Sequence, residues 1–504
     1  MCTFSFNTAD EVDVFRARLP AEDFELIDLT PPAAPSAGTT EVRTGAAPWL
    51  PQVCRDDLRC DVVVFSAEFG GCFFGASGLS LGLQEMEQAS CQRACDGLFH
   101  APREVFLLGC NTLATKDPDR RTPEDYLYVL LVHGFERSLA ERVVALRYGP
   151  LGASFRETQR RLFSGVPRIY GFSSVAPSGP RTAPMLHRYF DRKGDYRAYL
   201  ERAGRSTARN EDLFAAFRDT AVAQVSGLAP GEPAAADRDQ VCALYDDGRS
   251  VAERLRIVRG MFQRDDYMSF LPGIELFMAK HPGEALHGKE RALFEEVRAQ
   301  ERPREQILQL VRELDVSALR MELAHLAVHL DWMSRDEFRR IAVDGAHELV
   351  ERSLTSEGVD IACEIAKHEP VGDTFDAAAL PEHLFLRPEG LRLLDCIAPK
   401  DPRVSARLAD SLGAELESTR LWAGYALSRR LPLGDALLQR VAAHLADPSP
   451  DLRARLRWIF LTEAQQRPLA QDVERAVAER DAALAAELRA AGRQARSGGK
   501  PKGR

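Results

Sequence analysis

The sequence predicts a three-layer α/β domain with a mostly parallel sheet, followed by an all-α region that is like a helical repeat. Short apolar runs at Asp61–Phe65, Glu104–Leu108 and Arg168–Phe172 are separated by stretches with helical periodicity. Strands that alternate with helices form a largely parallel sheet with helices on both faces. After about residue 186, strand-like runs nearly vanish and one helical stretch follows another.

The first elements expected along the chain are two strands, Thr3–Phe6 and Phe24–Leu29, on either side of an amphipathic stretch over Asp10–Leu19. Helical periodicity then covers residues 81–98, 123–147 and 154–163, around the central strands. The predicted order is therefore a repeated alternation of strand and helix.

Two of the predicted strands end in residues that can carry chemistry. Asp61–Phe65 runs into Ser66–Gly71, which contains Glu68, and Glu104–Leu108 runs through Gly109 into Cys110 and Asn111. In parallel sheets the binding crevice lies beyond the carboxyl ends of the strands. We therefore expect Glu68 and Cys110 to lie at the same edge of the sheet.

The C-terminal half contains helical stretches punctuated by Pro, Gly and Asp. Two segments, Ala398–Ala409 and Ala446–Arg457, resemble each other at a spacing of about 47 residues, and each has an Asp-Pro turn before an Arg-bearing helix. This pattern resembles HEAT and armadillo repeats, in which helix pairs stack. A plain multi-helix domain is the alternative.

These changes of character suggest four parts of the chain. Residues 1–186 form the α/β domain, 187–240 a helical connector and linker, 241–490 the HEAT-like domain, and 491–504 a disordered basic tail.

Composition limits the classes of function. The 504 residues carry a formal charge of −9, which gives no general attraction to nucleic acid. Neither a membrane-spanning apolar run nor a signal-peptide pattern is present, and the ten cysteines are scattered. We therefore expect a cytoplasmic protein with free thiols, whose partner is a protein or peptide.

The two strand ends resemble those of caspase-like cysteine peptidases, most closely the bacterial CHAT type, over roughly Met1–Gly179. Order and spacing agree, because the segment ending at Gly70 and Gly71 precedes Cys110 by about forty residues. The resemblance implies a nucleophile at Cys110 and a catalytic histidine at the position of Glu68. It also implies cleft or oxyanion roles for Gly70, Gly71 and Asn111.

Glu68 changes what the resemblance implies for activity. A carboxylate is a weak base for a thiol, and its negative charge raises the pKa of the thiol. Three interpretations stay open: the domain is catalytically impaired and binds a partner, Cys110 uses a non-standard base in an active endopeptidase, or the fold is a different one. The histidines that could replace the lost base are His100, His133 and His187.

Other motifs point to no cofactor or metal. The turn Gly70–Ser77 is close to a phosphate-binding loop, but Ala76 occupies the lysine position. His325 and His329 have helical i, i+4 spacing, yet the glutamate that follows the first histidine in zinc peptidases is missing, so we expect a structural pair. We expect Arg147, Arg168 and Arg181 to be surface residues, with a place in the wall of the cleft as the alternative.

Overall fold

The computed structural model describes residues 1–6, 10–30, 49–75, 80–116, 121–133, 135, 137–351, 354, 356–367, 371–375, 380–399 and 401–496. The chain divides into two compact units. The first ends at Ile341 and the second continues from Ala342.

The first unit contains a six-stranded sheet in the order β2-β1-β3-β7-β8-β9. The strands are β1 (Cys2–Ser5), β2 (Ile27–Asp28), β3 (Val62–Ser66), β7 (Glu104–Leu108), β8 (Arg168–Phe172) and β9 (Val222–Val225). All neighbours pair in parallel except β8 and β9, which are antiparallel. The prediction of a mixed α/β part with a mostly parallel sheet is confirmed.

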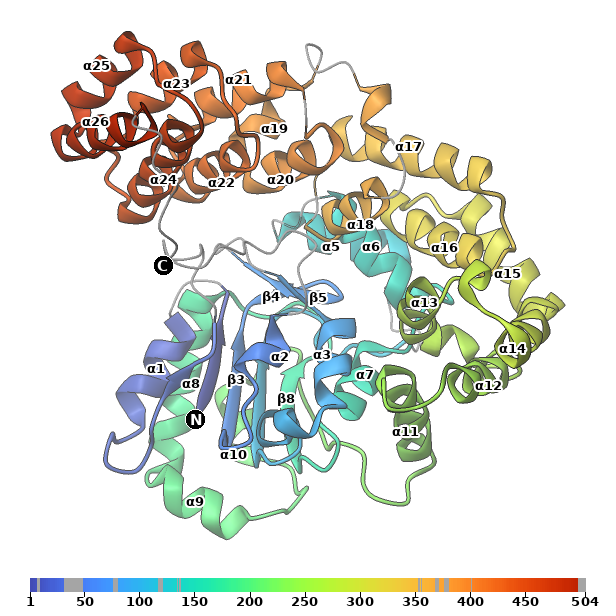
Figure 1. Ribbon diagram of the computed structural model, residues 1–504. Helices are drawn as coiled ribbons and strands as arrows, with labels where there is room; N and C mark the ends of the chain where they lie inside the picture. The colour runs from blue at the N-terminus through green and yellow to red at the C-terminus, as the bar shows by residue number, and fades with distance from the viewer. Residues whose placement is uncertain are drawn as a thin grey trace. The chain divides into compact units, whose positions relative to one another are not determined.

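The two faces of this sheet are apolar because successive residues of a buried strand point to opposite sides. Val62 and Val64 belong to one core, and Val63 and Phe65 belong to the other. The helices that pack on the side of Val62 and Val64 are α1 (Asp10–Arg18), α8 (Gly179–Lys193), α9 (Tyr196–Ala203) and α10 (Glu211–Ala216). The helices that pack on the side of Val63 and Phe65 are α2 (Leu50–Val53), α3 (Leu83–Ser90), α4 (Asp96–Phe99) and α7 (Phe155–Leu162). Figure 1 shows this layering, with α1 and α8 to the left of β3 and α2 and α3 to its right.

A small antiparallel sheet follows β3 at its carboxyl end. Its strands are β4 (Glu68–Phe69), β5 (Cys72–Phe74) and β6 (Ser80–Gly82). The helices α5 (Pro123–Val132) and α6 (Arg137–Tyr148) lie next to β4 and β5 (Figure 1). The helical run predicted over 123–147 is thus two helices.

The α/β part continues beyond residue 186, because β9 is the last strand of the main sheet. Much of the stretch expected to be a linker is also ordered as helix α11 (Pro233–Tyr245), which packs against α3 and α7. Tyr245 donates a hydrogen bond to Glu87 of α3 at 3.3 Å. The connector is therefore part of the first unit.

Further helices complete this unit and carry into the second. They are α12 (Val251–Phe262), α13 (Leu271–Lys280), α14 (Gly288–Arg298), α15 (Glu301–Glu313), α16 (Ser317–His329) and α17 (Arg335–Glu351). Helix α12 begins after Ser250, which forms a capping box with Glu253 at the first turn.

Eight of the ten cysteines are paired in disulfide bonds, so the expectation of free thiols is wrong for them. The pairs are Cys2–Cys60, Cys54–Cys95, Cys91–Cys242 and Cys363–Cys396. Cys72 and Cys110 carry free thiols. Widely spaced cysteines meet here because the strands and helices that carry them pack side by side.

The second unit is a stack of helices in two rows. Its helices are α18 (Ser356–Ala366), α19 (His383–Leu386), α20 (Pro388–Ile397), α21 (Pro402–Ser411), α22 (Glu417–Ser428), α23 (Asp435–Ala442), α24 (Pro450–Gln466), α25 (Gln471–Arg480) and α26 (Ala482–Arg496). Each even-numbered helix from α18 to α24 contacts the next even-numbered one, and each odd-numbered helix from α19 to α23 contacts the next odd-numbered one (Figure 1). Helix α26 extends to Arg496, and the rest of the predicted basic tail lies outside the described residues.

Among the residues that the structure describes, every helix is too short or too polar to cross a membrane.

Candidate functional site

The ends of β3 and β7 meet as the sequence predicts. Ser66 and Leu108 are register partners in the parallel ladder. Gly109 then passes so close to the neighbouring segment that a Cβ there would lie 2.8 Å from the Ala67 carbonyl oxygen and 3.1 Å from Phe69 Cβ. This close approach requires glycine, and it places Cys110 beside Glu68.

The Cys110 thiol is half-buried and weakly held. The amide N–H of Ala176 donates to its Sγ at 3.3 Å. Its side chain packs against a small core around Tyr126 and Leu130, together with Val175. The sulfur therefore lies among apolar groups with one hydrogen-bond donor.

Burial is the main reason that the pKa of the Cys110 thiol lies above its ordinary value. Burial raises the pKa of Cys110 to about 11, with a smaller contribution from the charge of Glu68, while the Ala176 hydrogen bond opposes the shift. With such a pKa only about one thiol in ten thousand is ionised at pH 7. A peptidase nucleophile requires the opposite shift, because the thiolate is the attacking species.

The histidines named from the sequence are engaged elsewhere or lie apart from the thiol. His100 contacts the carbonyls of Ser164 and Ser90 at 3.0 and 2.8 Å, at the amino end of β7. The Nδ1 of His187 accepts a hydrogen bond from Arg18 at 2.8 Å, and His133 is the C-cap of α5. Within the described ranges, Cys110 has no hydrogen bond or ion pair with a histidine.

Glu68 occupies the place of the expected histidine without its chemistry. Its side chain reaches solvent, yet burial on the protein side raises the pKa of its carboxyl group. Even a raised carboxyl pKa lies far below that of the Cys110 thiol, so transfer of the thiol proton to Glu68 is strongly uphill.

Asn111 is the most unusual residue of the site. Its φ of 62° is left-handed, and its side chain is fully buried. The backbone N–H donates to the Ser174 carbonyl at 2.7 Å, so it is not free to hold an oxyanion. Neither atom of the side-chain amide finds a hydrogen-bond partner within the described chain.

Gly70 and Gly71 serve packing more than substrate access. A Cβ on Gly70 would lie 2.8 Å from Leu139 of α6, and one on Gly71 would lie 3.1 Å from Leu146. Gly71 also has a φ of +92°, which the hairpin turn between β4 and β5 requires. These glycines let α6 cover the hairpin closely.

Tyr126 is a neighbour of the thiol that the sequence did not single out. The guanidinium carbon of Arg147 lies 4.2 Å from the centroid of the Tyr126 ring. Burial raises the pKa of Tyr126 to about 12, and Arg147 opposes this shift. Arg147 thus lies near Cys110 as a wall residue would, whereas Arg168 pairs with Glu104 at the other end of β7.

The helical histidine pair forms a compact polar contact in the first unit. The Nε2 atoms of His325 and His329 lie 3.0 Å apart, and the Nδ1 of His325 is 3.1 Å from a carboxylate oxygen of Glu275. No cluster of three or more potential metal ligands occurs among the residues described.

Comparison of the chain with family models, with curated proteins and with solved structures finds no match in any of the three. The family resemblance therefore depends on the sequence around Glu68 and Cys110 alone.

Proposed function

We propose that this chain is a catalytically impaired caspase-like protein of the CHAT type, with a regulatory or signalling role in a bacterium. It acts by binding a protein partner through the cleft at Cys110 and through its helical-repeat region. The observation that carries this proposal is the Cys110 thiol, whose pKa is raised by burial beside Glu68 and which has no histidine contact in the described chain.

The second unit supports a binding role. Helices that stack in two rows present a long continuous surface, and stacked helix pairs commonly use such a surface for protein recognition. A HEAT-like repeat is the architecture that fits this stacking and the repeated Asp-Pro turns.

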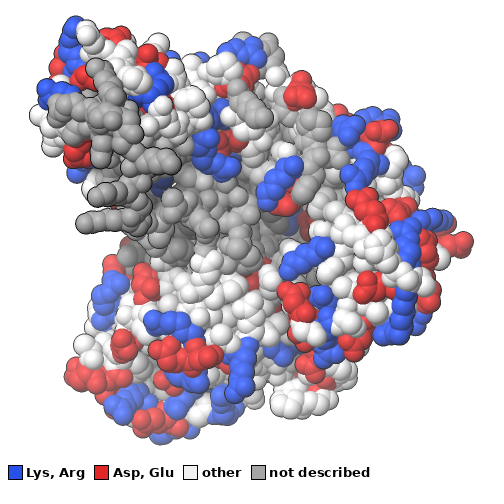
Figure 2. All heavy atoms as spheres, viewed as in Figure 1, with Lys and Arg blue, Asp and Glu red and all other residues white. Residues whose placement is uncertain are grey.

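The surface charge favours a protein partner over nucleic acid. Figure 2 shows basic and acidic side chains interspersed over the visible face. On the part of this face that the structure describes, the mixture forms no extended positive surface of the kind that neutralises phosphates, and the formal charge of the chain is −9. A cytoplasmic location stays a prediction, and the four disulfide bonds count against it because cytosolic thiols are kept reduced.

Labelling with a peptidyl acyloxymethyl ketone at pH 6.5 tests the proposal. We expect the wild type and Cys110→Ala to be labelled to the same low extent, because the Cys110 thiol is protonated at this pH. Rapid labelling that Cys110→Ala abolishes would instead support an active endopeptidase with a non-standard base.

The variant Glu68→His separates loss of the base from wider loss of the site. Labelling that appears in Glu68→His and disappears in Glu68→His/Cys110→Ala would show that only the base is missing. Continued absence of labelling in a folded variant would show that oxyanion and substrate groups are lost too.

A further inference from the structure

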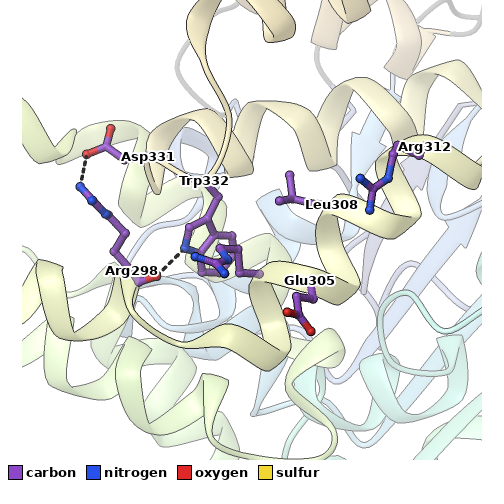
Figure 3. Close-up of a pocket in the computed structure, with 7 residues that line it drawn as sticks. Arg298, Glu305, Leu308, Arg312, Asp331 and Trp332 are labelled. Atoms are coloured by element: carbon purple, nitrogen blue, oxygen red, sulfur yellow. Dashed lines mark hydrogen bonds and ion pairs between the residues drawn. The ribbon is translucent and has the colours of Figure 1, made fainter.

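A pocket of about 430 Å³ lies in the helical part of the first unit, away from Cys110. Its lining comes from α14, α15 and the turn after α16 (Figure 3). This volume is within the range of ligand-binding pockets in proteins. The pocket therefore has room for several side chains of a peptide.

One wall of the pocket is a stripe of three residues on α15. Arg304, Leu308 and Arg312 are spaced four residues apart, so they follow one face of the helix. Neither arginine side chain forms a hydrogen bond or ion pair with any residue in the described part of the chain. Many other arginines of this protein are paired with carboxylates. The two unpaired guanidinium groups at the pocket are therefore available to an anionic ligand.

The opposite wall is held rigidly by the turn that ends α16. The amide of Trp332 donates to the Ala327 carbonyl at 2.9 Å and that of Asp331 donates to the Val328 carbonyl at 3.2 Å, which is the Schellman pattern. The Trp332 indole N–H donates to the Arg298 carbonyl at 2.8 Å, and its ring packs 5.5 Å from that of Phe262.

The charges of this wall largely compensate one another. The guanidinium of Arg298 lies 3.7 Å from the Asp331 carboxylate, as Figure 3 shows, and 3.5 Å from that of Glu295. The cationic groups left for a ligand are therefore Arg304 and Arg312. Glu305, the other acidic residue of the lining, weakens the attraction for anions.

We infer that this pocket binds an extended acidic peptide of a partner protein. Arg304 and Arg312 are two helical turns apart, about 12 Å along the axis. Carboxylates at positions i and i+4 of an extended strand are about 13 Å apart, which matches this separation. A large apolar side chain between them meets Leu308 and the largely buried Trp332, so the recognised pattern is acidic, spacer, apolar, spacer, acidic.

Fluorescence anisotropy with a labelled peptide containing Glu-Ala-Phe-Ala-Glu tests this inference on the full-length protein. We expect saturable binding that weakens by about 10- to 100-fold in Arg304→Gln/Arg312→Gln, because two charge-assisted contacts are lost. Glu305→Gln should tighten binding by a few-fold, because it removes a repulsive charge.

Two controls separate this site from general attraction to a charged surface. Arg256→Gln removes an exposed arginine of α12 outside the pocket and should bind like the wild type. A peptide with Gln in place of both Glu residues should not bind.

Equal binding of the acidic and the Gln-containing peptide would overturn the inference, as would wild-type affinity in the double arginine variant. Inorganic phosphate that occupies the site while the acidic peptide does not would also overturn it, and would identify a simple anion site. Because the pocket contains neither Cys110 nor Glu68, none of these outcomes depends on the chemistry of the cleft.

Discussion

The two ends of strand β7 carry polar residues of opposite character. At the amino end, the fully buried Glu104 carboxylate accepts hydrogen bonds from Arg168 at 2.8 Å and from the hydroxyls of Tyr170, Tyr196 and Tyr199. At the carboxyl end, the buried side-chain amide of Asn111 has no partner in the described chain, and the neighbouring thiol has a single donor.

This difference separates a structural role from a functional one. A buried charge that is fully hydrogen-bonded stabilises the fold around it. Removal of any one partner leaves the remaining buried groups without a hydrogen bond in a medium of low dielectric constant, which is costly. A buried polar group without partners costs stability, and such costs persist where a site serves another purpose. The carboxyl end is therefore the end that fits the proposed site.

The largest expected effect is at the amino end. Glu104→Ala leaves Arg168 and three tyrosine hydroxyls without their shared acceptor, so we expect a loss of about 3–5 kcal/mol in the free energy of unfolding. Urea unfolding measures the loss, and hydrogen exchange of the β7 peptide assigns the transition. Glu201→Ala, an exposed ion-pair partner of Arg197, should cost less than about 0.5 kcal/mol. A loss below about 1 kcal/mol in Glu104→Ala would remove the contrast between the two ends.

A smaller effect of opposite sign is expected at Asn111. Asn111→Gly keeps the left-handed backbone and removes the buried amide, so stability should stay equal or rise by up to about 1 kcal/mol. Asn111→Ala removes the same amide but places a Cβ at a φ of 62°, which costs about 1 kcal/mol relative to glycine. Thermal unfolding of the two variants checks the order, and equal stability would contradict the left-handed conformation.

The smallest effect concerns the pH dependence at Glu68. Burial raises the pKa of this carboxyl in the fold, so its contribution to stability is present below its ordinary pKa and is lost as pH rises through the folded pKa. Glu68→Gln should therefore gain stability relative to wild type between pH 4 and pH 7, as measured by urea midpoints.

Glu253 offers a control of opposite sign for that experiment. Hydrogen bonds from Ser250 lower the pKa of the Glu253 carboxyl, so its contribution is present above its ordinary pKa and is lost as pH falls. Glu253→Gln should then lose stability at pH 7 and approach wild type at low pH. The same sign in both variants would contradict the assigned environment of Glu68.

The central strands could be predicted because their signal is local. Val62–Ser66, Glu104–Leu108 and Arg168–Phe172 are apolar runs buried on both faces, which is how central strands of a parallel sheet are composed. The edge strand β9, Val222–Val225, is short and half-exposed, so the same criterion misses it. The hairpin strands β4 and β5 are shorter still and become strands only by pairing within the small sheet, β5 with both β4 and β6.

The remaining features depend on residues far apart in the sequence. Eight cysteines allow 105 sets of pairs, so spacing alone could not give the four disulfides. The partners of Glu104 come from β8 and α9, and no local pattern marks a carboxylate at the start of a strand as buried. The adjacency of Cys110 and Glu68 was predictable, because parallel strands bring their carboxyl ends together.

The most direct test of the account is the pH dependence of Cys110 alkylation by iodoacetamide, with the modified peptide identified by mass spectrometry. We expect a rate of alkylation that rises about tenfold per pH unit from neutral pH, with half-maximal reactivity near the thiol pKa of about 11. Half-maximal reactivity below pH 7 would show an activated thiolate, and would contradict the claim that the cleft at Cys110 binds without catalysis.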